Sequence, residues 1–348
     1  MRVNESGRSP GVREVALAAG VSRQTVSRVL NDHPNIRTET RERVLAAMTD
    51  LNFRPNHAAR ILTTARSRTI GVLAAPGPRL FGPASSIDAI EQAARDYGYF
   101  VAVAYSTTHD LRDFESALSH LVAQSIEGIV IVAPQQRSQE ALAAASIQIP
   151  SVTLHEFAPT AGERVFAEQV AAARIATHHL VECGHRRILH LSGPEDWSEA
   201  RARRQGFLEE AQRSGVVPLV SSPGDWSARS GAQISRRALA DSTITAVFSA
   251  NDQMALGVLH TARALGRRIP DDLAVVGFDD IPEAAYFSPP LTTMRQDFVE
   301  LGRRAVERLL DDIHGGSGVS SPGDTLLTGS VPRLIVREST SRRLSATP

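Results

Sequence analysis

The sequence predicts an α/β fold in which a small helical head is followed by two doubly wound α/β lobes. Short helical patterns fill the first fifty residues, and apolar β-branched runs alternate with helical stretches through the rest of the chain. The alternating part, 68–340, is long for one open sheet, which favours two lobes. With 348 residues and 42% hydrophobic content, the chain can build two or three compact units.

Charge is distributed unevenly, although the formal net charge is zero. Residues 1–68 hold 12 Arg and 6 Asp or Glu, whereas the rest of the chain holds 26 Arg and 32 Asp or Glu. A basic end of this kind favours a polyanionic partner. Every basic residue is Arg, which we attribute to composition bias.

Cysteine usage and hydropathy indicate the compartment. Cys183 is the single cysteine, so the chain cannot form an internal disulfide, which fits a reducing environment. The N-terminus has no apolar signal segment, and no stretch approaches the ~20 apolar residues of a membrane span. We therefore expect a cytoplasmic protein with no membrane partner.

Three short helices are predicted in the head. Val and Ala residues between positions 12 and 19 follow the spacing of one buried helical face. Gly20 ends this pattern, and Ser22 is a suitable N-cap for a second helix over 23–30. With a third helix over 38–51, this is the arrangement of a helix-turn-helix unit.

The second helix has a polar outward face made of Arg23, Gln24 and Arg28, accompanied by Thr25 and Ser27. Arg can donate two hydrogen bonds to guanine and Gln can pair with adenine, so this face suits the reading of base edges. The hydroxyl groups and the helix N-terminus suit phosphates. The alternative is an ordinary solvated face.

Residues 54–62, after the third helix, have helical propensity but few core contacts. A helix this short is marginal in isolation, so we expect it to be ordered when docked. Leu62 is a candidate wedge between base pairs in the minor groove. An ordinary interdomain linker is the alternative.

In the remainder of the chain, six buried parallel strands are expected at 70–74, 128–132, 151–154, 188–191, 246–249 and 273–277. Seven helices are expected at 86–97, 114–124, 170–182, 202–214, 230–240, 252–265 and 298–313. Ligands of such folds bind at the carboxyl ends of the strands, here in a cleft between lobes.

Several polar side chains follow these strands. Asn251 and Asp252 come after the fifth strand, Asp279 after the sixth, and Arg203 after the fourth, while Trp226 lies in a loop. Oxygen acceptors, a guanidinium and one indole suit a neutral polyhydroxyl ligand. For each residue alone the alternative is a helix cap, an ion pair or a core aromatic, and for Asp252 the cap is favoured.

Runs in both halves of the chain resemble the lac repressor family. In the head they are Val15-Ala16, Ala19-Gly20-Val21-Ser22, Thr25 to Asn31, Thr38-Arg41-Val44 and Arg54-Pro55-Asn56. In the body they are Gly224 to Ala228, Ala250 to Gly257, Pro289 to Thr293 and Gln296-Asp297-Phe298. The likeness covers nearly the whole chain.

The resemblance implies a helix-turn-helix DNA-binding domain over 1–54, a hinge helix and linker over 55–67, a two-lobed sugar-binding and dimerisation domain of the periplasmic-binding-protein type over 68–340, and a tail over 341–348. It also implies that the second helix enters the major groove and that the hinge inserts a leucine into the minor groove. The residues then expected to contact DNA are Ser22, Arg23, Gln24, Thr25, Ser27, Arg28, Asn31, Asn56, Ala59 and Leu62.

Phe81 follows the first strand and is expected to face the cleft, where it packs on the ligand or on the other lobe. The resemblance implies an inducer pocket lined by Arg203, Trp226, Asn251, Asp279, Gln296 and Phe298, with His155 at the interlobe cleft. The family has an aspartate where this chain has His155 and a small hydroxyl residue where it has Glu199. A β-galactoside or another β-linked disaccharide is the expected effector.

Together these features predict a sugar-responsive transcriptional repressor, without enzymatic activity, cofactor or metal. It would bind a pseudo-palindromic operator as a homodimer and be released by the sugar. Residues 339–348 show no heptad pattern, so a dimer is expected rather than a tetramer.

Three other readings remain. An enzyme could use Asp252 with Asp279 as a glycosidase pair, or Cys183 with His185 as nucleophile and base. Phosphate-binding loops, metal-ligand spacings and nucleophile elbows are missing from the sequence, which argues against it. The basic head argues against a transport binding protein. A regulator of the same fold could instead respond to a purine or a phosphoprotein.

Overall fold

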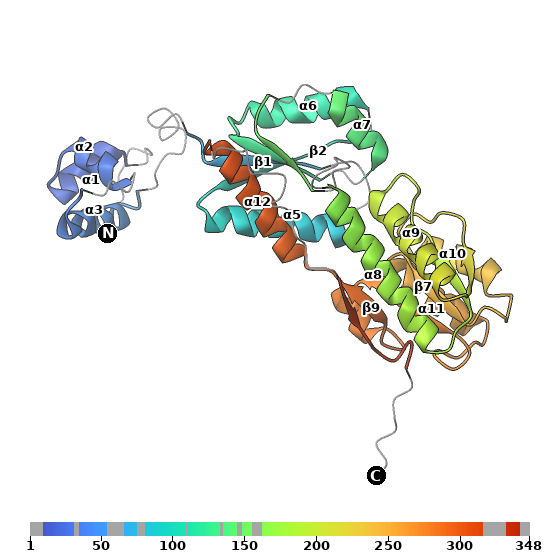
Figure 1. Ribbon diagram of the computed structural model, residues 1–348. Helices are drawn as coiled ribbons and strands as arrows, with labels where there is room; N and C mark the ends of the chain where they lie inside the picture. Colours follow the sequence, from blue (N-terminus) through green and yellow to red (C-terminus); the bar gives the residue numbers. More distant parts are fainter. Residues whose placement is uncertain are drawn as a thin grey trace, which may run out of the picture. The chain divides into compact units, whose positions relative to one another are not determined.

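The computed structural model describes residues 10–30, 35–53, 66–74, 81–108, 110–132, 135–144, 148–154, 162–315 and 332–341. The chain divides into two compact units, Met1–Ser67 and Arg68–Pro348, whose elements are labelled in Figure 1. In the described ranges no helix is both long and apolar enough to cross a membrane.

The first unit contains the three helices expected from the sequence, α1 (Val12–Ala19), α2 (Arg23–Leu30) and α3 (Thr38–Asp50). Val15, Val26 and Val44 are fully buried where the three helices meet. Gly20 ends α1 in the left-handed region, with φ of 65°, which glycine adopts without steric cost. The Ser22 hydroxyl accepts the N–H of Thr25 at 3.0 Å, which confirms its N-cap role at α2.

The first lobe of the second unit is a four-stranded parallel sheet in the order β2-β1-β3-β4. Its strands are β1 (Thr69–Ala74), β2 (Phe100–Tyr105), β3 (Gly128–Val132) and β4 (Ser151–Thr153). Its helices are α5 (Phe81–Asp96), α6 (Leu111–Val122), α7 (Gln136–Ala144) and α12 (Phe298–Ile313). Along β1, Val72 packs with residues of α5 and α12, whereas Leu73 packs with residues of α6.

The second lobe is a six-stranded sheet in the order β10-β9-β8-β7-β5-β6, parallel except for β10. Its strands are β5 (Arg187–Leu191), β6 (Val217–Val220), β7 (Ala246–Ser249), β8 (Ala274–Asp279), β9 (Thr292–Arg295) and β10 (Arg333–Ile335). Its helices are α8 (Gly162–Glu182), α9 (Ser198–Arg213), α10 (Ala228–Ala238), α11 (Asp252–Ala264) and the 3-10 helix η1 (Pro282–Tyr286).

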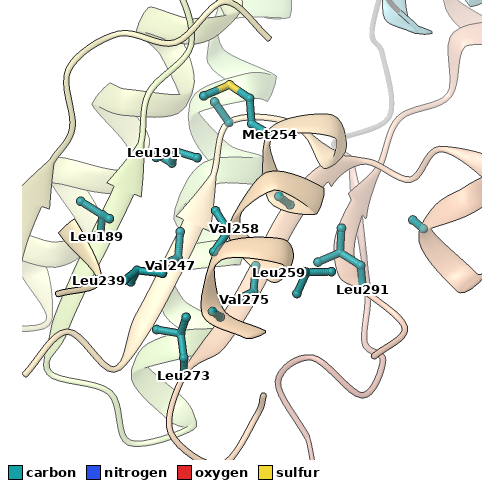
Figure 2. Packing of buried hydrophobic residues seen from close by; sticks show 14 of the residues in the cluster. Leu189, Leu191, Leu239, Val247, Met254, Val258, Leu259, Leu273, Val275 and Leu291 are labelled. Atoms are coloured by element: carbon teal, nitrogen blue, oxygen red, sulfur yellow. The ribbon is translucent and has the colours of Figure 1, made fainter. Parts of the chain in front are cut away.

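Two apolar clusters cover the faces of this second sheet. Leu189, Val247 and Val275 pack with α11 on one face (Figure 2). Ile188 and Phe248 pack with α8 and α9 on the other face. Helices therefore cover both faces, as in the first lobe, and the two doubly wound lobes predicted from the sequence are confirmed.

The chain passes between the lobes more than once. The helix α12 follows β9 of the second lobe but packs along α5 in the first lobe (Figure 1). Ala305, Val306 and Leu309 of α12 are fully buried in the first-lobe core. Because α12 begins in the second lobe, its first turn lies at the junction where the lobes face each other.

The structure adds four strands, one α-helix and one 3-10 helix that were not predicted: β2, β6, β9, β10, α7 and η1. Three of these strands, β2, β6 and β10, lie at sheet edges. The edge strand β6 includes Pro218, which has no N–H to donate and is tolerated at an edge. The strand β8 reaches Asp279, so this carboxylate is the last residue of a buried strand.

Candidate functional site

A pocket lies between the two lobes, where the carboxyl ends of β5, β7 and β8 face the first turns of α5 and α12. The cavity that remains in it is about 60 Å³. A buried water needs at least ~10–15 Å³ of such space, so the cavity has room for a few water molecules. A ligand with the size of a sugar therefore requires the walls to move apart.

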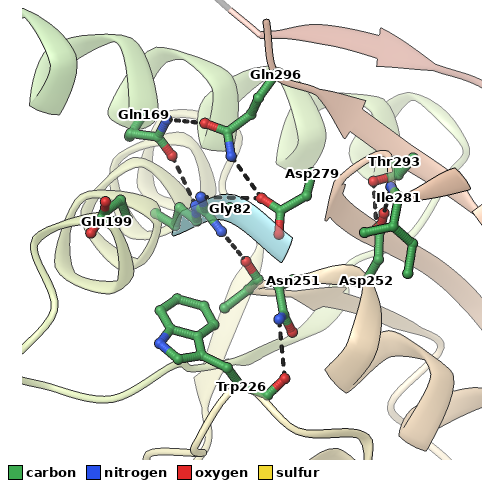
Figure 3. Close-up of polar contacts among 12 residues, drawn as sticks. Gly82, Gln169, Glu199, Trp226, Asn251, Asp252, Asp279, Ile281, Thr293 and Gln296 are labelled. Carbon is green, nitrogen blue, oxygen red and sulfur yellow. Dashed lines mark hydrogen bonds and ion pairs between the residues drawn. The ribbon is translucent and has the colours of Figure 1, made fainter. Parts of the chain in front are cut away.

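Arg203 is the centre of the polar wall of this pocket, and its neighbours Gln169, Asp279 and Gln296 are labelled in Figure 3. Its Nε donates to Gln169 at 2.9 Å, its Nη2 lies 3.5 Å from Asp279, and its Nη1 donates to the Ala250 carbonyl. The guanidinium carbon lies 3.7 Å from the centre of the Phe278 ring. Burial lowers the pKa of Arg203, while the nearby carboxylates, Asp279 first, act against this shift.

Gln169 and Gln296 complete a ring of hydrogen bonds with Arg203 and Asp279. The Gln169 amide donates to the Gln296 side-chain oxygen at 2.7 Å, and the Gln296 amide donates to Asp279 Oδ1 at 2.7 Å. Since Arg203 donates to both Gln169 and Asp279, the four side chains form a closed cycle. Such a network holds donors and acceptors in fixed positions.

Asp279 is 7% exposed and has a φ of 110° at the end of β8. Burial raises the pKa of its carboxyl to about 6, although Arg203 and the Gln296 hydrogen bond act in the opposite direction. Its Oδ1 accepts both bonds of the ring. Within the described part of the chain, Oδ2 accepts no hydrogen bond, so this oxygen remains able to accept one from a ligand hydroxyl.

Trp226 supplies an aromatic wall. Its ring packs so tightly on Gly193 that a Cβ at that position would lie 2.5 Å from a ring carbon. Its carbonyl accepts the Asn251 amide at 3.1 Å. The indole N–H is buried without a partner among the described residues. Trp226 thus offers an apolar ring and one unused donor, a combination that suits a sugar ring with its hydroxyls.

Phe81 and Phe298 lie on the first-lobe side of the pocket, edge to face, with ring centroids 5.7 Å apart. Phe81 also packs against the second-lobe core. The two possibilities left open by the sequence, ligand or opposite lobe, are therefore compatible, because one ring lines the pocket and contacts the other lobe as well.

Asn251 lines the pocket as expected, whereas Asp252 takes a role that differs from the cap favoured by the sequence. Asn251 is the N-cap of α11, with its side-chain oxygen accepting the Met254 N–H at 2.9 Å. The preference for Asp252 as the cap was therefore wrong. Asp252 accepts from the Ile281 N–H at 2.9 Å and from the Thr293 hydroxyl at 2.6 Å, and burial raises its pKa well above the usual value. It ties α11 to β9 from within the core.

A loop of the second lobe contacts the first lobe beside the pocket. The Gln136 N–H donates to the Asp196 carbonyl at 2.7 Å, and Arg137 pairs with the Asp196 carboxylate at 2.8 Å. Arg201 donates to the Gln136 side chain at 2.6 Å. We call these four residues, Gln136, Arg137, Asp196 and Arg201, the latch. Directly beside it, Gln135 forms a β-bridge with Trp197, which lines the pocket.

In the head, α2 presents Arg23, Gln24 and Arg28 to solvent. Thr25 and Ser27 are half-buried, and the Thr25 hydroxyl lies 2.9 Å from that of Ser22. The exposed face combines two cations and an amide with a helix N-terminus, which suits a nucleic acid. The expected DNA contacts Asn31, Asn56, Ala59 and Leu62 lie outside the described residues, as does His155, which was expected at the interlobe cleft.

Known proteins match both units. Residues 12–56 match the family described as bacterial regulatory proteins, lacI family, and residues 177–340 match a periplasmic binding protein-like domain. The lactose operon repressor of Escherichia coli K12 is 37% identical over 300 residues, which are 85% of this chain and 83% of that repressor. This chain belongs to the lacI family. It is a DNA-binding transcriptional repressor.

Other lacI-family relatives match over similar lengths. The ribose operon repressor of Halalkalibacterium halodurans is 33% identical over 94% of this chain and 96% of its own length. The PurR repressor of Haemophilus influenzae is 32% identical over 94% and 98%. These relatives are named for different operons or regulators. Membership of the family therefore does not identify the effector of this chain.

Solved structures of the lacI family share the fold. The lac repressor dimer bound to operator and the anti-inducer ONPF superposes with a TM-score of 0.78 at 33% identity, covering 96% of this chain and 99% of that chain. The complex of the transcriptional regulator CelR with cellobiose has a TM-score of 0.64 at 29% identity, covering 95% and 99%. The fold class read from the sequence is thus confirmed.

The relatives of this lacI-family chain are repressors rather than enzymes. The imidazole next to Cys183 is that of His179, at 3.8 Å, and burial raises the pKa of the thiol, which disfavours the nucleophilic thiolate. Among the residues that the structure describes, no group of three or more His, Cys, Asp or Glu could hold a metal ion.

The pocket also contains Gln169 and Trp197, which the sequence did not single out, and Glu199, which it named only as a departure from the family. Gln169 comes from the first half of α8 and reaches the strand ends from the side. Trp197 and Glu199 follow β5, so the rule that ligands bind beyond strand ends pointed to their region. Nothing in the residues around Gln169 would have separated it from the other polar residues of its helix.

Proposed function

We propose that this repressor is released from a pseudo-palindromic operator when a small sugar binds between its lobes, and that a β-galactoside or another β-linked disaccharide is the effector. The observation that carries the proposal is the hydrogen-bonded ring of Arg203, Gln169, Gln296 and Asp279 facing the Trp226 indole in one pocket.

The chemistry of the pocket favours a neutral sugar. The Asp279 carboxylate accepts from ligand hydroxyls, and the Trp226 indole covers an apolar sugar face with its N–H left to donate. The buried Arg203 is already paired with Asp279, so it does not demand an anionic ligand. The CelR–cellobiose complex, a β-linked disaccharide held by a protein of the same fold, supports this choice.

The size of the cavity supports release rather than promotion of DNA binding. With about 60 Å³ left in the pocket, the walls are close together in this arrangement, which is similar to that of the operator-bound lac repressor. A sugar favours a second arrangement in which the lobes stand differently. By thermodynamic linkage, a ligand that binds better to the second arrangement lowers the affinity for any partner, such as operator DNA, that binds only to the first.

Operator contacts are assigned to the head and to the segment after it. In this proposal Arg23, Gln24 and Arg28 read bases, and Ser22, Thr25 and Ser27 contact phosphates. The remaining contacts fall on Asn31, Asn56, Ala59 and Leu62.

A homodimer is the proposed assembly. Phe100 and Tyr105 on the edge strand β2 are 60% and 54% exposed, and Tyr286 of the second lobe is 88% exposed. Large apolar side chains left open on both lobes are typical of an interface. The lac repressor dimer, which shares the fold, supports the same assembly. Two heads related by a two-fold axis would match two half-sites.

The test is a titration of the purified full-length protein on the DNA upstream of its own gene, at fixed salt, with and without lactose, cellobiose and methyl β-D-galactoside. Tight, sequence-selective binding that one of these sugars weakens is the expected result. Tight binding that no sugar disturbs would refute the effector class and leave the repressor in place.

A further inference from the structure

The loop from Ser192 to Trp197 lies between β5 and α9 and contacts two different parts of the molecule. On one side Asp196 belongs to the latch with α7 of the first lobe. On the other side Trp197, the next residue, lines the pocket and stands edge-on to Trp226 with ring centroids 5.4 Å apart. Adjacent residues thus face the opposite lobe and the ligand site.

The walls of the pocket differ in how firmly they are held. Trp226 is 4% exposed and its ring lies on Gly193, and Arg203 is fixed by the hydrogen-bonded ring. Trp197 is half-buried, with its neighbour Asp196 held by Arg137, a side chain that is 63% exposed. When a ligand enters a cavity of about 60 Å³, the wall formed by Trp197 therefore yields most easily.

We propose that Trp197 is a further effector-contacting residue, and that Arg137 and Asp196 are positioning residues that hold it against the first lobe. This inference rests on the proposed sugar-binding function. A sugar that displaces Trp197 also moves Asp196, because the two are adjacent and Trp197 is itself bridged to Gln135. Because Asp196 belongs to the latch, a sugar that displaces Trp197 also disturbs the contact between the two lobes and so changes the position of the first lobe.

The sign of the effect follows from linkage. The latch stabilises the arrangement with the small cavity, so it opposes the sugar, and the sugar opposes the latch by the same factor. Breaking the latch should therefore tighten sugar binding and weaken operator binding in the absence of sugar. The pair is partly exposed, and pairs of this kind change equilibria by roughly 2- to 5-fold.

The chain carries its own reporter for this test. It contains two tryptophans, Trp197 and Trp226, and both line the pocket. Tryptophan emission consequently reports on sugar binding, and quenching of that emission by acrylamide reports on exposure of the pocket wall without any sugar. Trp226→Phe leaves Trp197 as the reporter, and Trp197→Phe leaves Trp226.

The variants are Arg137→Asp, Asp196→Arg and the double exchange, made in the full-length protein and in the Trp226→Phe background. Each single exchange places like charges opposite each other and should increase acrylamide quenching of Trp197. In the protein that retains Trp226, each should also tighten binding of lactose, cellobiose or methyl β-D-galactoside by roughly 2- to 5-fold, as expected for a partly exposed pair. The double exchange restores opposite charges and should bring both the quenching and the sugar affinity most of the way back to the wild-type values.

Arg112→Asp is the matched control, because Arg112 is an exposed first-lobe arginine on α6 with no partner among the described residues. It should leave quenching and sugar affinity at the wild-type value. Trp197→Phe should remove the increase in quenching that Arg137→Asp causes, which assigns the change to that indole. Thermal unfolding of every variant separates repositioning of the loop from loss of the fold.

Two results would overturn the inference: quenching that the single exchanges leave unchanged, or single and double exchanges that behave alike. If sugars bind the wild type and all variants equally, the positioning role fails and the sugar-binding function stands. If no sugar alters the emission but the exchanges alter quenching as expected, the effector class fails while the link between the latch and Trp197 holds.

Discussion

Arg203 and Asp279 form an ion pair at 3.5 Å in which 4% and 8% of the two side chains are exposed. An ion pair this deeply buried does not stabilise a fold by itself, because the loss of hydration offsets the attraction. Gln169 and Gln296 add hydrogen bonds to the two charged groups, which reduces the cost of burying them. We therefore assign the pair to the ligand site rather than to stabilisation of the fold. Replacing one of its members tests this, because stability and release by sugar can be measured separately.

Asp279→Asn should leave operator binding intact and abolish release by sugar. Asparagine keeps the size of the side chain and tolerates the positive φ, but leaves the buried guanidinium without its counter-charge. Because burial raises the pKa of Asp279 to about 6, folding disfavours its ionised form, so urea unfolding at pH 7 should show no loss of stability on this replacement. Asp312→Asn, which breaks the exposed pair with Arg308, should cost less than ~1 kcal/mol. Release that persists in Asp279→Asn would place the sugar elsewhere.

Sugar affinity should fall between pH 7 and pH 5. Burial raises the pKa of Asp279 to about 6 from an ordinary value of 3.8, so the carboxyl takes up a proton in this range and loses its charge opposite Arg203. Tryptophan emission titrations of the wild-type protein at the two pH values measure the change. An affinity that is equal at pH 5 and pH 7 would contradict the assignment.

The same shift gives a signed prediction for stability. The folded carboxyl of Asp279 binds its proton more tightly than the unfolded one, so its contribution to stability is fully present below pH 3.8 and is lost as the pH rises to about 6. The difference in unfolding free energy between wild type and Asp279→Asn should therefore change across pH 4–6 and be flat above pH 7. Urea unfolding curves collected across this range test it.

Gly193→Ala should displace the indole of Trp226. The new Cβ would lie 2.5–2.8 Å from three ring carbons, and the ring cannot yield as a flexible chain would. Overpacking of this kind costs about 1–3 kcal/mol. We expect altered tryptophan emission, weaker sugar binding and unchanged operator affinity. Gly184→Ala, where nothing lies within 4 Å of the added Cβ, is a control for emission and sugar binding, although its positive φ lowers stability.

Arg28→Ala should cost about 1–3 kcal/mol of operator affinity and relax the preference at one base position, because an arginine that donates twice to guanine distinguishes it from the other bases. Binding to a library of single-base operator variants measures the change. Arg43, exposed on α3, is the control, and its replacement by alanine should leave every base preference as it was. A preference unchanged in Arg28→Ala would remove this residue from the base readers.

The predictable part of the fold is the part whose burial leaves a pattern. Every residue of β1 and of β3 is buried, and both strands read as continuous apolar runs. The strand β2 carries an apolar run as well, but it lies at a sheet edge where Phe100 and Tyr105 are exposed, and burial of both faces cannot be assumed there. The strand β10 has three residues and lies antiparallel at an edge of the second-lobe sheet, so it leaves no periodicity to detect.

The candidate site divides in a similar way. Arg203 and Asp279 were indicated because they follow buried strands, and Trp226 because its indole suits a sugar face, and the three line one pocket. Gln169 was not indicated, since its contact with Gln296 spans 127 positions and depends on how α8 crosses the strand ends. The latch shows the same limit, because the pairing of Arg137 with Asp196 joins two lobes whose relative position no local pattern contains.

The first lobe is encoded early but completed late. Three of its fully buried residues, Ala305, Val306 and Leu309, belong to α12, which follows β9 in the chain. During synthesis on the ribosome the head can fold first and most of the second lobe next. Until α12 has been made, β1 and β3 have one apolar face partly uncovered. Chains interrupted after β9 should therefore aggregate or engage chaperones, even though every strand of the first lobe has already been made.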